Sequence, residues 1–340
     1  MANILNDLTE LSGSNPYVHI ISLDFSKAFD TVRHSTLTNK LANLPLLDNI
    51  YNWIVDYLTN RSHCTKANGV ISDPLPINAS IIQGSALGPV SYIINASDLK
   101  ATVPGNRLHK YADDTYLIVP ACNGHTITTE LLAIEQWANK NNLKLNLAKS
   151  CEMIVTTKRS AKLNNPPHIP GIIRVDCVKI LGTVICKNLS VSNHVDNLTH
   201  LSGQNLYALK TLKAHGMPLN QLNTVSHATL VSRLLHAAPA WRGFANCSDL
   251  ARLQAILSKA TKWGVMKAPA LQIKELFDEA DGNLFAKILN NTDHVMYPLL
   301  PPKKNNIYNL RSRKHNHSLP ANDNNMSRNF LHRMLYKDSY

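Results

Sequence analysis

The 340-residue sequence predicts an α/β or α+β protein, in which a small sheet with helices is followed by a helical domain. Short apolar, β-branched runs alternate with segments of helical apolar spacing in the first part of the chain. From about residue 189 helical spacing dominates, and beyond residue 296 the chain is rich in Pro, Asn and basic residues. We therefore predict three parts: residues 1–188, residues 189–296, and a C-terminal tail, residues 297–340.

The first strand is predicted at Val18–Leu23, a short apolar run that delivers Asp24 at its end. Residues 36–58 show helical spacing that is interrupted by a proline. Between residues 68 and 82, Gly, Pro and Asp separate pairs of Val and Ile, which predicts short strands. A helix is expected to follow over residues 87–99.

A tight hairpin is predicted next. Residues 108–111 and 115–119 have the composition of strands, and Ala112, Asp113 and Asp114 stand between them. Two acids thus interrupt an otherwise apolar hairpin.

The remaining elements are predicted from the spacing of apolar residues and from the Pro and Gly residues between them. Residues 128–141 predict a helix, residues 144–156 alternate as a strand does, and residues 172–184 are expected to be extended. Helices are predicted from about residue 191 onward, and the tail is expected to end in a short amphipathic segment at residues 330–336.

Charge is distributed unevenly along the chain. Residues 1–120 hold 8 Lys and Arg against 10 Asp and Glu, whereas residues 121–340 hold 27 against 13. This asymmetry is typical of a nucleic-acid enzyme, because phosphates need counter-charge while catalytic metals need acid ligands. Solubility alone also explains it.

The cysteines and the N-terminus bear on the compartment. No Cys-x-x-Cys motif occurs, so we expect neither a zinc ribbon nor a redox motif, and we interpret all six cysteines as reduced thiols. They are Cys64, Cys122, Cys151, Cys177, Cys186 and Cys247. The first residues lack the features of a signal peptide, which favours an intracellular protein of the nucleus, the cytoplasm or both. Prolines and glycines in the uncharged run between Asp73 and Asp98 argue against a membrane span.

Three carboxylates suggest metal chemistry. Asp24 follows a strand of buried type, and Asp113 and Asp114 are adjacent. Neighbouring carboxylates repel each other unless a cation lies between them, and hard oxygen ligands select Mg²⁺ or Mn²⁺. Two such ions support nucleotidyl transfer by in-line displacement. An Asp-Asp pair also has a plainer explanation, since Asp is common in turns through local hydrogen bonds.

The segments around these acids resemble motifs A, B and C of reverse transcriptases. They are ISLDFSKAFDTV at residues 21–32, IIQGSALGPV at residues 81–90 and HKYADDTYLIV at residues 109–119, in the family's order and approximate spacing. Residues 137–155 resemble motif D, and residues 178–195 resemble the segment that leads out of the palm. Residues 307–315 and 329–340 are similar to the ends of LINE open reading frames. The whole is similar to the polymerase of non-LTR (LINE-type) retrotransposons.

The resemblance implies an RNA-directed DNA polymerase that uses two Mg²⁺ (or Mn²⁺) ions, an RNA template, a DNA primer and dNTPs. It implies a palm with a small antiparallel sheet and partial fingers in residues 1–188, and a helical thumb-like domain in residues 189–296. Asp24 and Asp113 are implied as catalytic metal ligands, with Asp114 supporting the site. No membrane partner is expected, and the oligomeric state stays open.

Further residues match the family by position. The Phe25 carbonyl is expected to complete one ion's shell, and Phe29 matches the steric gate that crowds a 2′-hydroxyl. Gln83 and Gly84 match the pair that lies against the nucleotide and template, and Lys149 matches a lysine that protonates pyrophosphate. The plainer alternatives are a core phenylalanine, an ordinary turn and a solvated surface lysine.

Other matching residues have supporting roles. Lys27 and Asp30 are interpreted as packing and capping residues of the motif A turn, and Tyr111 and Ala112 agree with the family's x-Ala-Asp-Asp. Basic residues of the helical domain are expected to track a duplex backbone or to serve solubility alone. They are Lys210, Lys213, Arg233, Lys259 and Lys262.

The chain departs from the family at its beginning. A full member has an endonuclease and a fingers region before motif A, and we do not find them in this sequence. The family's Cys/His knuckle is missing as well. We therefore interpret the chain as N-terminally truncated. The alternative function is therefore a catalytically inactive remnant that only binds RNA or DNA. A viral RNA polymerase fits the acids but fits Phe29 poorly, and intron maturases and telomerase are expected to differ around motif A.

Overall fold

The computed structural model describes residues 1–82, 84–156, 166–304, 315–321 and 326–337. Its contacts divide the chain into two compact units. Unit 1 comprises Met1–Val18, Val155–Lys162 and Asp176–Tyr340, and unit 2 comprises His19–Ile154 and Leu163–Val175. This division differs from the boundaries predicted at residues 188 and 296, because the first residues of the chain pack with its C-terminal part.

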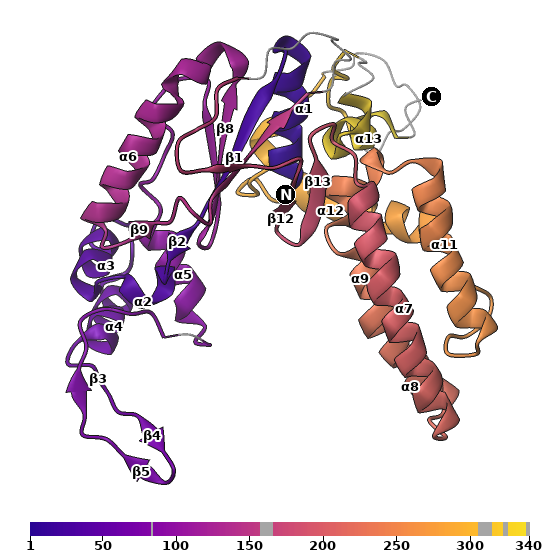
Figure 1. Cartoon of the computed structure of the whole chain (residues 1–340), viewed down its shortest axis with the longest axis horizontal. Coiled ribbons are helices and arrows are strands. Elements are labelled where there is room, and N and C mark those ends of the chain that lie inside the picture. The colour runs from indigo at the N-terminus through magenta and orange to yellow at the C-terminus, as the bar shows by residue number, and fades with distance from the viewer. Residues whose placement is uncertain (83, 157–165, 305–314, 322–325, 338–340) are drawn as a thin grey trace. The chain divides into compact units, whose positions relative to one another are not determined.

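A five-stranded sheet forms the centre of unit 2 (Figure 1). Its strands, in spatial order, are β11 (Ile173–Arg174), β10 (Cys151–Val155), β1 (Val18–Leu23), β8 (Asp114–Pro120) and β7 (Arg107–Tyr111). Strands β7 and β8 are antiparallel, as expected, whereas β10 and β11 at the other edge are parallel. The predicted α+β class with a small sheet is confirmed.

The inner strands β1 and β8 carry the core of unit 2. Side chains alternate along a strand, so Ile21 and Leu23 of β1 share one face of the sheet with Leu117 and Val119 of β8. All four are at most 2% exposed, and they belong to one apolar cluster with the helices that cover this face. These helices are α3 (His34–Leu41), α5 (Leu87–Asn95) and α6 (Ile127–Lys140). Burial of each such side chain contributes about 1.5–3 kcal/mol.

Two lysines hold the C-terminal end of α5. Lys40 donates to the carbonyl of Asn95 and pairs with Asp98 at 2.7 Å. Lys110 of β7 donates to the carbonyls of Ala96 and, at 2.8 Å, Leu99. Cations at this position are favourable because the last carbonyls of a helix lack partners and carry its negative end. Lys110 thus ties the end of α5 to the hairpin that bears the two acids, and Lys40 ties it to α3.

The segment between α3 and α5 is mostly exposed. Helix α4 (Asp48–Leu58) buries none of its residues, and short strands follow it, as predicted (Figure 1). Strand β3 (Ser62–His63) pairs with β6 (Leu75–Pro76), and β4 (Lys66–Ala67) pairs with β5 (Val70–Ile71).

The strand predicted over residues 144–156 is wrong as one element. The structure has β9 (Lys144–Leu145) and β10, separated by a turn in which the Ser150 N–H bonds the Asn146 carbonyl at 3.0 Å. Asn and Ser favour such turns because their side chains bond nearby backbone groups.

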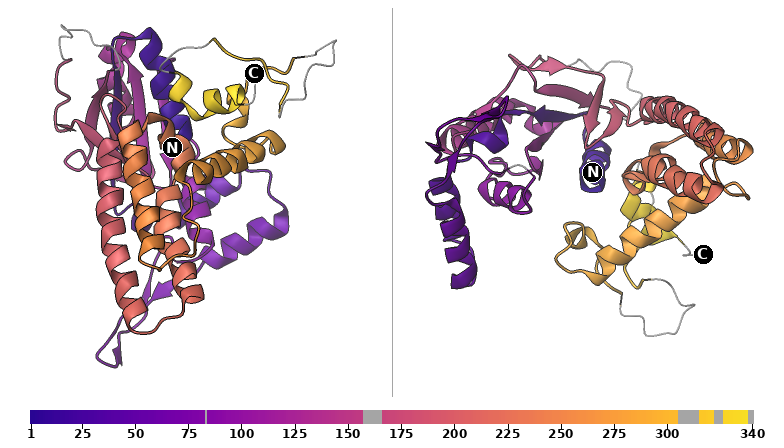
Figure 2. Two further views of the ribbon diagram at one scale, coloured as in Figure 1. Left: turned by 90° about the vertical axis from the view of Figure 1, so that its right-hand side faces the viewer. Right: turned by 90° about the horizontal axis from the view of Figure 1, so that it is seen from below.

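Unit 1 is helical, and the predicted change near residue 191 is confirmed. A hairpin of β12 (Cys177–Ile180) and β13 (Thr183–Cys186) leads into the helices. The helices are α7 (Ser192–Ala214), α8 (Leu219–Ser226), α9 (Ser232–Leu235), α10 (Ala238–Trp241), α11 (Cys247–Lys262), α12 (Ile273–Asn290) and α13 (Phe330–Tyr336). Helices α7 and α11 lie side by side (Figures 1 and 2). Within the described ranges, none of the helices has the length and apolar character needed to span a bilayer.

The first helix of the chain completes unit 1. Helix α1 (Ala2–Ser14) packs against α10 and α13, and its Leu8 is fully buried. The side-chain amide of Asn329 donates to Asn6 Oδ1 at 3.0 Å and to Thr9 Oγ1 at 3.1 Å. The two ends of the described chain therefore stabilise each other, a contact that apolar spacing alone does not reveal.

Two cysteines are not free thiols. Cys177 and Cys186 face each other across β12 and β13 and form a disulfide. The interpretation of all six cysteines as reduced is therefore wrong for this pair, because hairpin register brings together residues nine positions apart. The free cysteines of the described part are Cys64, Cys122, Cys151 and Cys247.

Truncating the buried face of α1 is expected to destabilise unit 1. Leu8→Ala leaves a cavity and is expected to lower the free energy of unfolding by about 2–5 kcal/mol. Leu132→Ala, at a position 52% exposed on α6, serves as the control and is expected to change it by less than about 1 kcal/mol. Urea unfolding of both variants measures the difference. Equal, small losses would contradict the docking of α1.

Candidate active site

The backbone of Asp24 is held on both sides. Its N–H donates to the Ser150 hydroxyl at 3.1 Å, and its carbonyl accepts from the Asn146 N–H at 2.8 Å. Ser150 is 1% exposed, and its hydroxyl donates in turn to the Asn146 carbonyl at 2.8 Å. Strand β2 (Phe25–Ser26) then pairs with β9. The turn between β9 and β10 thus fixes Asp24 while its carboxylate stays partly exposed.

The other two acids lie on the β7–β8 hairpin. Tyr111 and Asp114 are register partners, so the loop consists of Ala112 and Asp113 alone. Asp114 therefore begins β8, whereas the sequence placed it in the turn. Both Asp113 and Asp114 are exposed, and Ala112 has a positive φ of 52°. Two-residue hairpin loops need such a backbone to match the twist of the strands.

The three carboxylates lie within electrostatic reach of one another. Strands β1 and β8 are neighbours in the sheet, and the charge of Asp24, which follows β1, acts on Asp114, which begins β8. Desolvation, followed by the charges of Asp113 and Asp24, raises the pKa of Asp114 above its ordinary value. The arrangement is therefore self-repelling, and a divalent cation would relieve it.

These acids do not form a preformed metal cage. In the described part of the chain, no group of three or more His, Cys, Asp or Glu side chains has the geometry to hold a metal ion. Mg²⁺ does not require one, since it keeps several waters and is usually bound by one or two carboxylates together with substrate phosphates. The donor set of hard oxygens fits such an ion.

Aromatic side chains pack beneath the acids. Phe25 is buried, with its ring edge-on to Trp137 at a centroid distance of 6.1 Å. Phe29 is partly buried and stacks on Tyr92 of α5, with centroids 4.9 Å apart and planes at 29°. Burial, followed by the charge of Asp113, raises the pKa of Tyr92. Tyr92 therefore links the Phe29 ring to the acids, a role that was not predicted from the sequence.

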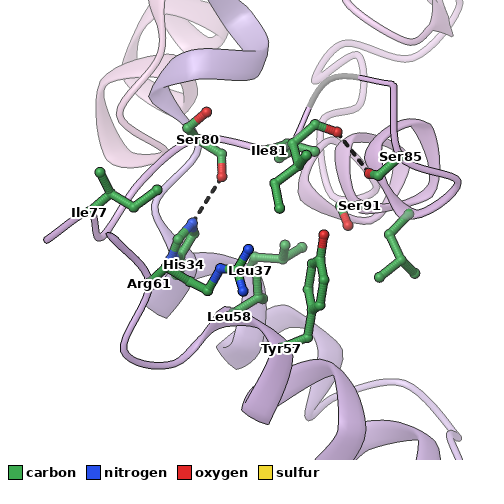
Figure 3. A pocket seen from close by; sticks show the side chains of 12 residues that line it. His34, Leu37, Tyr57, Leu58, Arg61, Ile77, Ser80, Ile81, Ser85 and Ser91 are labelled. Carbon is green, nitrogen blue, oxygen red and sulfur yellow. Dashed lines mark hydrogen bonds between the residues drawn. The ribbon is translucent and has the colours of Figure 1, made fainter. Parts of the chain in front are cut away.

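The segment before α5 is tied to the motif A turn. The Ile81 N–H donates to the Phe29 carbonyl at 2.8 Å, and His34 Nε2 donates to the Ser80 carbonyl at 2.9 Å (Figure 3). The Ser85 hydroxyl donates to the Ile82 carbonyl at 2.8 Å. His34, Ser80, Ile81, Ile82 and Ser85 are among the residues that line a small cavity of about 30 Å³, enough for one water.

Of the two residues predicted to face the nucleotide, the structure describes only one. Gln83 lies outside the described residues. Gly84 is exposed with φ +80°, and a Cβ there would meet no atom within 4 Å. Glycine adopts this backbone conformation without strain, and the space beside it is open to a ligand.

Three further predicted residues lie in the two turns that flank Asp24. Lys149 is exposed, and its N–H bonds the Asn146 carbonyl at 3.2 Å. Lys27, with φ 49°, occupies the N-cap of α2 (Ala28–Thr31) without a side-chain bond, and its carbonyl accepts from the Asp30 N–H at 2.9 Å. Lys27 therefore caps the helix as predicted, but through its backbone carbonyl and not through its side chain.

The five basic residues named in the predicted helical domain lie at two places. Lys210 and Lys259 lie over the Trp263 ring, at 5.4 and 4.6 Å from its centroid, and Lys213 donates to the Trp263 carbonyl at 2.7 Å. Lys262 precedes Trp263 in the chain. These four form the Trp263 lysine cluster, whereas Arg233 lies apart in a pocket. The role of Trp263 in assembling them was not predicted.

The part of the chain that carries these residues is similar to known proteins. The model of a family described as reverse transcriptase (RNA-dependent DNA polymerase) matches residues 3–185, more than half of the chain. The RNA-directed DNA polymerase from mobile element jockey of Drosophila melanogaster is 28% identical in an alignment of 207 residues that covers 57% of this chain and 22% of that protein. The probable RNA-directed DNA polymerase from transposon BS of the same organism is 26% identical in an alignment of 266 residues that covers 72% of this chain and 29% of that protein. The chain thus spans less than a third of their length.

A solved structure is also similar. Telomerase from Candida tropicalis, in complex with a TWJ fragment of telomeric RNA, aligns with 86% of this chain and 50% of its own, at a TM-score of 0.45 and 11% identity.

Replacing Ala112 by glycine is expected to stabilise the hairpin. A non-glycine residue at positive φ costs about 1–2 kcal/mol, and glycine removes this cost at the expense of some unfolded-state entropy. Ala112→Gly is therefore expected to raise the free energy of unfolding by about 0.5–1 kcal/mol. Ala133→Gly, within α6, is the matched control and is expected to lower it by about 1 kcal/mol. Denaturant titration compares them, and a loss at residue 112 would refute the loop geometry.

Proposed function

The chain belongs to the reverse transcriptase (RNA-dependent DNA polymerase) family, and from this premise we propose that it is the RNA-directed DNA polymerase of a LINE-type element. It would transfer a nucleotide from a dNTP to a primer 3′-hydroxyl, copying RNA. The observation that carries the proposal is the meeting of Asp24 with Asp113 and Asp114 at one end of the sheet.

The proposed reaction is an in-line displacement. The primer 3′-oxygen forms a bond to the α-phosphorus of the dNTP, the bond from that phosphorus to the bridging oxygen breaks, and pyrophosphate leaves. Asp24 and Asp113 would hold two Mg²⁺ (or Mn²⁺) ions, with Asp114 in support. Bound divalent ions would supply activation of the hydroxyl and neutralisation of the phosphates. The rigid attachment of Asp24 to the 146–150 turn supports this role, because such a reaction depends on positioning.

We propose that the residues around the acids select the nucleotide substrate. Phe29, backed by Tyr92, would crowd a 2′-hydroxyl and so favour dNTPs. The Gln83–Gly84 segment would lie against the nucleotide and template, and the Phe25 carbonyl would complete one ion's shell. Lys149 would donate a proton to the leaving pyrophosphate.

An RNA template and a DNA primer are the proposed macromolecular partners. The Trp263 lysine cluster supports nucleic-acid binding, because the indole ring holds two ammonium groups close together at low entropic cost. Several lysines in one place neutralise several phosphates, which makes binding strong at low salt and insensitive to sequence.

Removing one carboxylate tests the proposed chemistry. Asp113→Asn keeps the size of the side chain but removes its charge, and is expected to reduce primer extension at least about 100-fold. The assay contains an RNA template, a DNA primer, dNTPs and Mg²⁺. Asp73→Asn, an exposed acid outside the site, is the control and is expected to extend primers normally. Extension unaffected by Asp113→Asn would refute the proposal.

A second variant tests the attachment of Asp24. Ser150→Ala removes the acceptor of the Asp24 N–H and is expected to lower kcat about tenfold, while the KM for the primer-template stays unchanged. Ser72→Ala is a matched control, because the Ser72 hydroxyl likewise accepts a backbone N–H, that of Thr65 at 2.9 Å, away from the acids. Steady-state kinetics compare the two. An equal effect of both variants would show that Ser150 has only a structural role.

A further inference from the structure

Helix α4 lies wholly within unit 2 and carries none of the residues assigned to the proposed reaction. It contacts α3 (Figure 1), and Tyr51, Ile54 and Leu58 on one side of it pack, half-buried, against the core of the unit. A helix of 11 residues is marginal in water without tertiary packing. A further apolar contact along α4 would therefore stabilise it.

A row of large apolar side chains runs along another side of the same segment. Leu47 is 68% exposed, Trp53 is 57% exposed and Ile50 is 44% exposed. Trp53 stacks on Tyr57, with ring centroids 5.7 Å apart and planes at 17°, so the two rings support each other. We call this row the α4 ridge, and it consists of Leu47, Ile50, Trp53 and Tyr57.

The spacing of the α4 ridge indicates the shape of its partner. Its members follow one another at intervals of three, three and four residues, which places them in one line along a helix. Such a line is what one helix presents to another when their side chains interdigitate. Single exposed apolar side chains are ordinary, but a contiguous row marks an interaction site, and Trp is enriched among residues that dominate binding. The α4 ridge therefore fits the apolar stripe of another helix.

The charges beside the α4 ridge decide between the possible occupants. Residues 42–60 contain two acids, Asp48 and Asp56, and no Lys or Arg. Both acids are exposed, whereas Arg61 lies beyond the helix, 5.1 Å from the centroid of the Tyr57 ring. A second copy of the chain would add two more acids, and phosphates or anionic lipid headgroups would be repelled. A partner with Lys or Arg beside its apolar stripe would be attracted.

We infer that the α4 ridge is a docking surface for a cationic amphipathic helix of another polypeptide. Apolar side chains of that helix pack on Ile50 and Trp53, and its Lys or Arg side chains lie beside Asp56. Removal of the exposed apolar area from water supplies the affinity, and the acids supply the preference for a cationic partner. The inference is independent of DNA synthesis.

The first test uses a defined probe. A fluorescent synthetic peptide of Leu and Lys, with Leu at helical spacing, is titrated with the full chain, and binding is measured by anisotropy. We expect it to bind at least about tenfold more tightly than a scrambled peptide of the same composition, and than a Leu and Glu peptide of the same spacing. Equal binding of the helical and scrambled Lys peptides would overturn the inference, because general attraction of cations would explain it. Equal binding of the Glu peptide would overturn the preference for a cationic partner.

The second test removes apolar side chains from the surface. Leu47→Ser and Trp53→Ser are each expected to weaken binding of the Leu and Lys peptide at least about fivefold. Leu132→Ser, at an exposed position of α6, is the matched control and is expected to weaken it less than about twofold. Leu47 is the N-cap of α4, where Ser is favourable, so a loss of binding in Leu47→Ser does not arise from a loss of the helix. Equal effects at residues 47 and 132 would contradict a role for the α4 ridge.

The third test changes charge at constant size. Asp56→Asn is expected to weaken binding of the Leu and Lys peptide about threefold at low salt, and less at high salt because exposed charges are screened. Asp73→Asn, an exposed acid outside α4, is the control and is expected to leave binding unchanged. Equal effects of the two variants would show that the net charge of the chain attracts the peptide and would overturn the placement of the cations beside Asp56.

Two further measurements test the other occupants. Sedimentation velocity over a series of chain concentrations tests a second copy, and flotation with vesicles of phosphatidylcholine and phosphatidylserine tests a membrane surface. We expect neither self-association nor vesicle binding that depends on Trp53. Self-association or vesicle binding of the native chain that Trp53→Ser abolishes would assign the α4 ridge to that occupant and would overturn the inference.

Discussion

Mutual repulsion among Asp24, Asp113 and Asp114 is the constraint around which unit 2 is arranged. Desolvation of Asp114, followed by the charges of Asp113 and Asp24, raises its pKa, so the fold that holds these carboxylates together opposes their ionisation. The buried inner strands β1 and β8 compensate for this, since nearly every residue of both is removed from water. The acids therefore stand at the end of the best-packed part of the sheet, where apolar burial offsets their repulsion and where a divalent cation would remove it.

Rigid support extends outward from the acids in two directions. On one side, the turn containing Asn146 and Ser150 holds the backbone of Asp24. On the other, Tyr92 of α5 packs on Phe29, while Lys40 and Lys110 hold the end of that helix. Each contact joins segments far apart in the chain, so a change in any of them would shift the geometry of the site without touching a carboxylate.

Unit 1 uses a different design, in which surface cations are positioned by aromatic and backbone contacts. Trp263 gathers lysines from α7 and α11, and His236 fixes the hairpin loop beside Arg233. At Trp263 the ammonium groups contact a neutral ring and a neutral carbonyl, so their charge remains available to a ligand. Polyanions are bound through this kind of uncompensated charge. The proposed division of labour therefore assigns chemistry to the acids of unit 2 and nucleic-acid binding to the cations of unit 1.

Much of the fold follows from local pattern. The strands at residues 18–23 and 108–119, the helix at residues 128–141 and the C-terminal helix at residues 330–336 were predicted within a few residues, because apolar periodicity reflects which face of an element is buried. Motif order alone was enough to predict the family. Hairpin register accounts for the errors at Asp114 and at the Cys177–Cys186 pair, and a contact between distant residues accounts for another. Residues 144–156 were predicted as one strand, but their turn forms to hold Asp24.

The sequence by itself determined the residue types of the site, its elements and its family, since these depend on periodicity and on the order of short motifs. Only the tertiary structure decided that Asp24 meets the β7–β8 hairpin, that Tyr92 lies behind Phe29 and that α1 belongs to unit 1. It also decided that Cys177 pairs with Cys186. The physical reason is that strand order, hairpin register and side-chain packing are properties of chain segments brought together by folding, and no single segment encodes which partner will bury its surface.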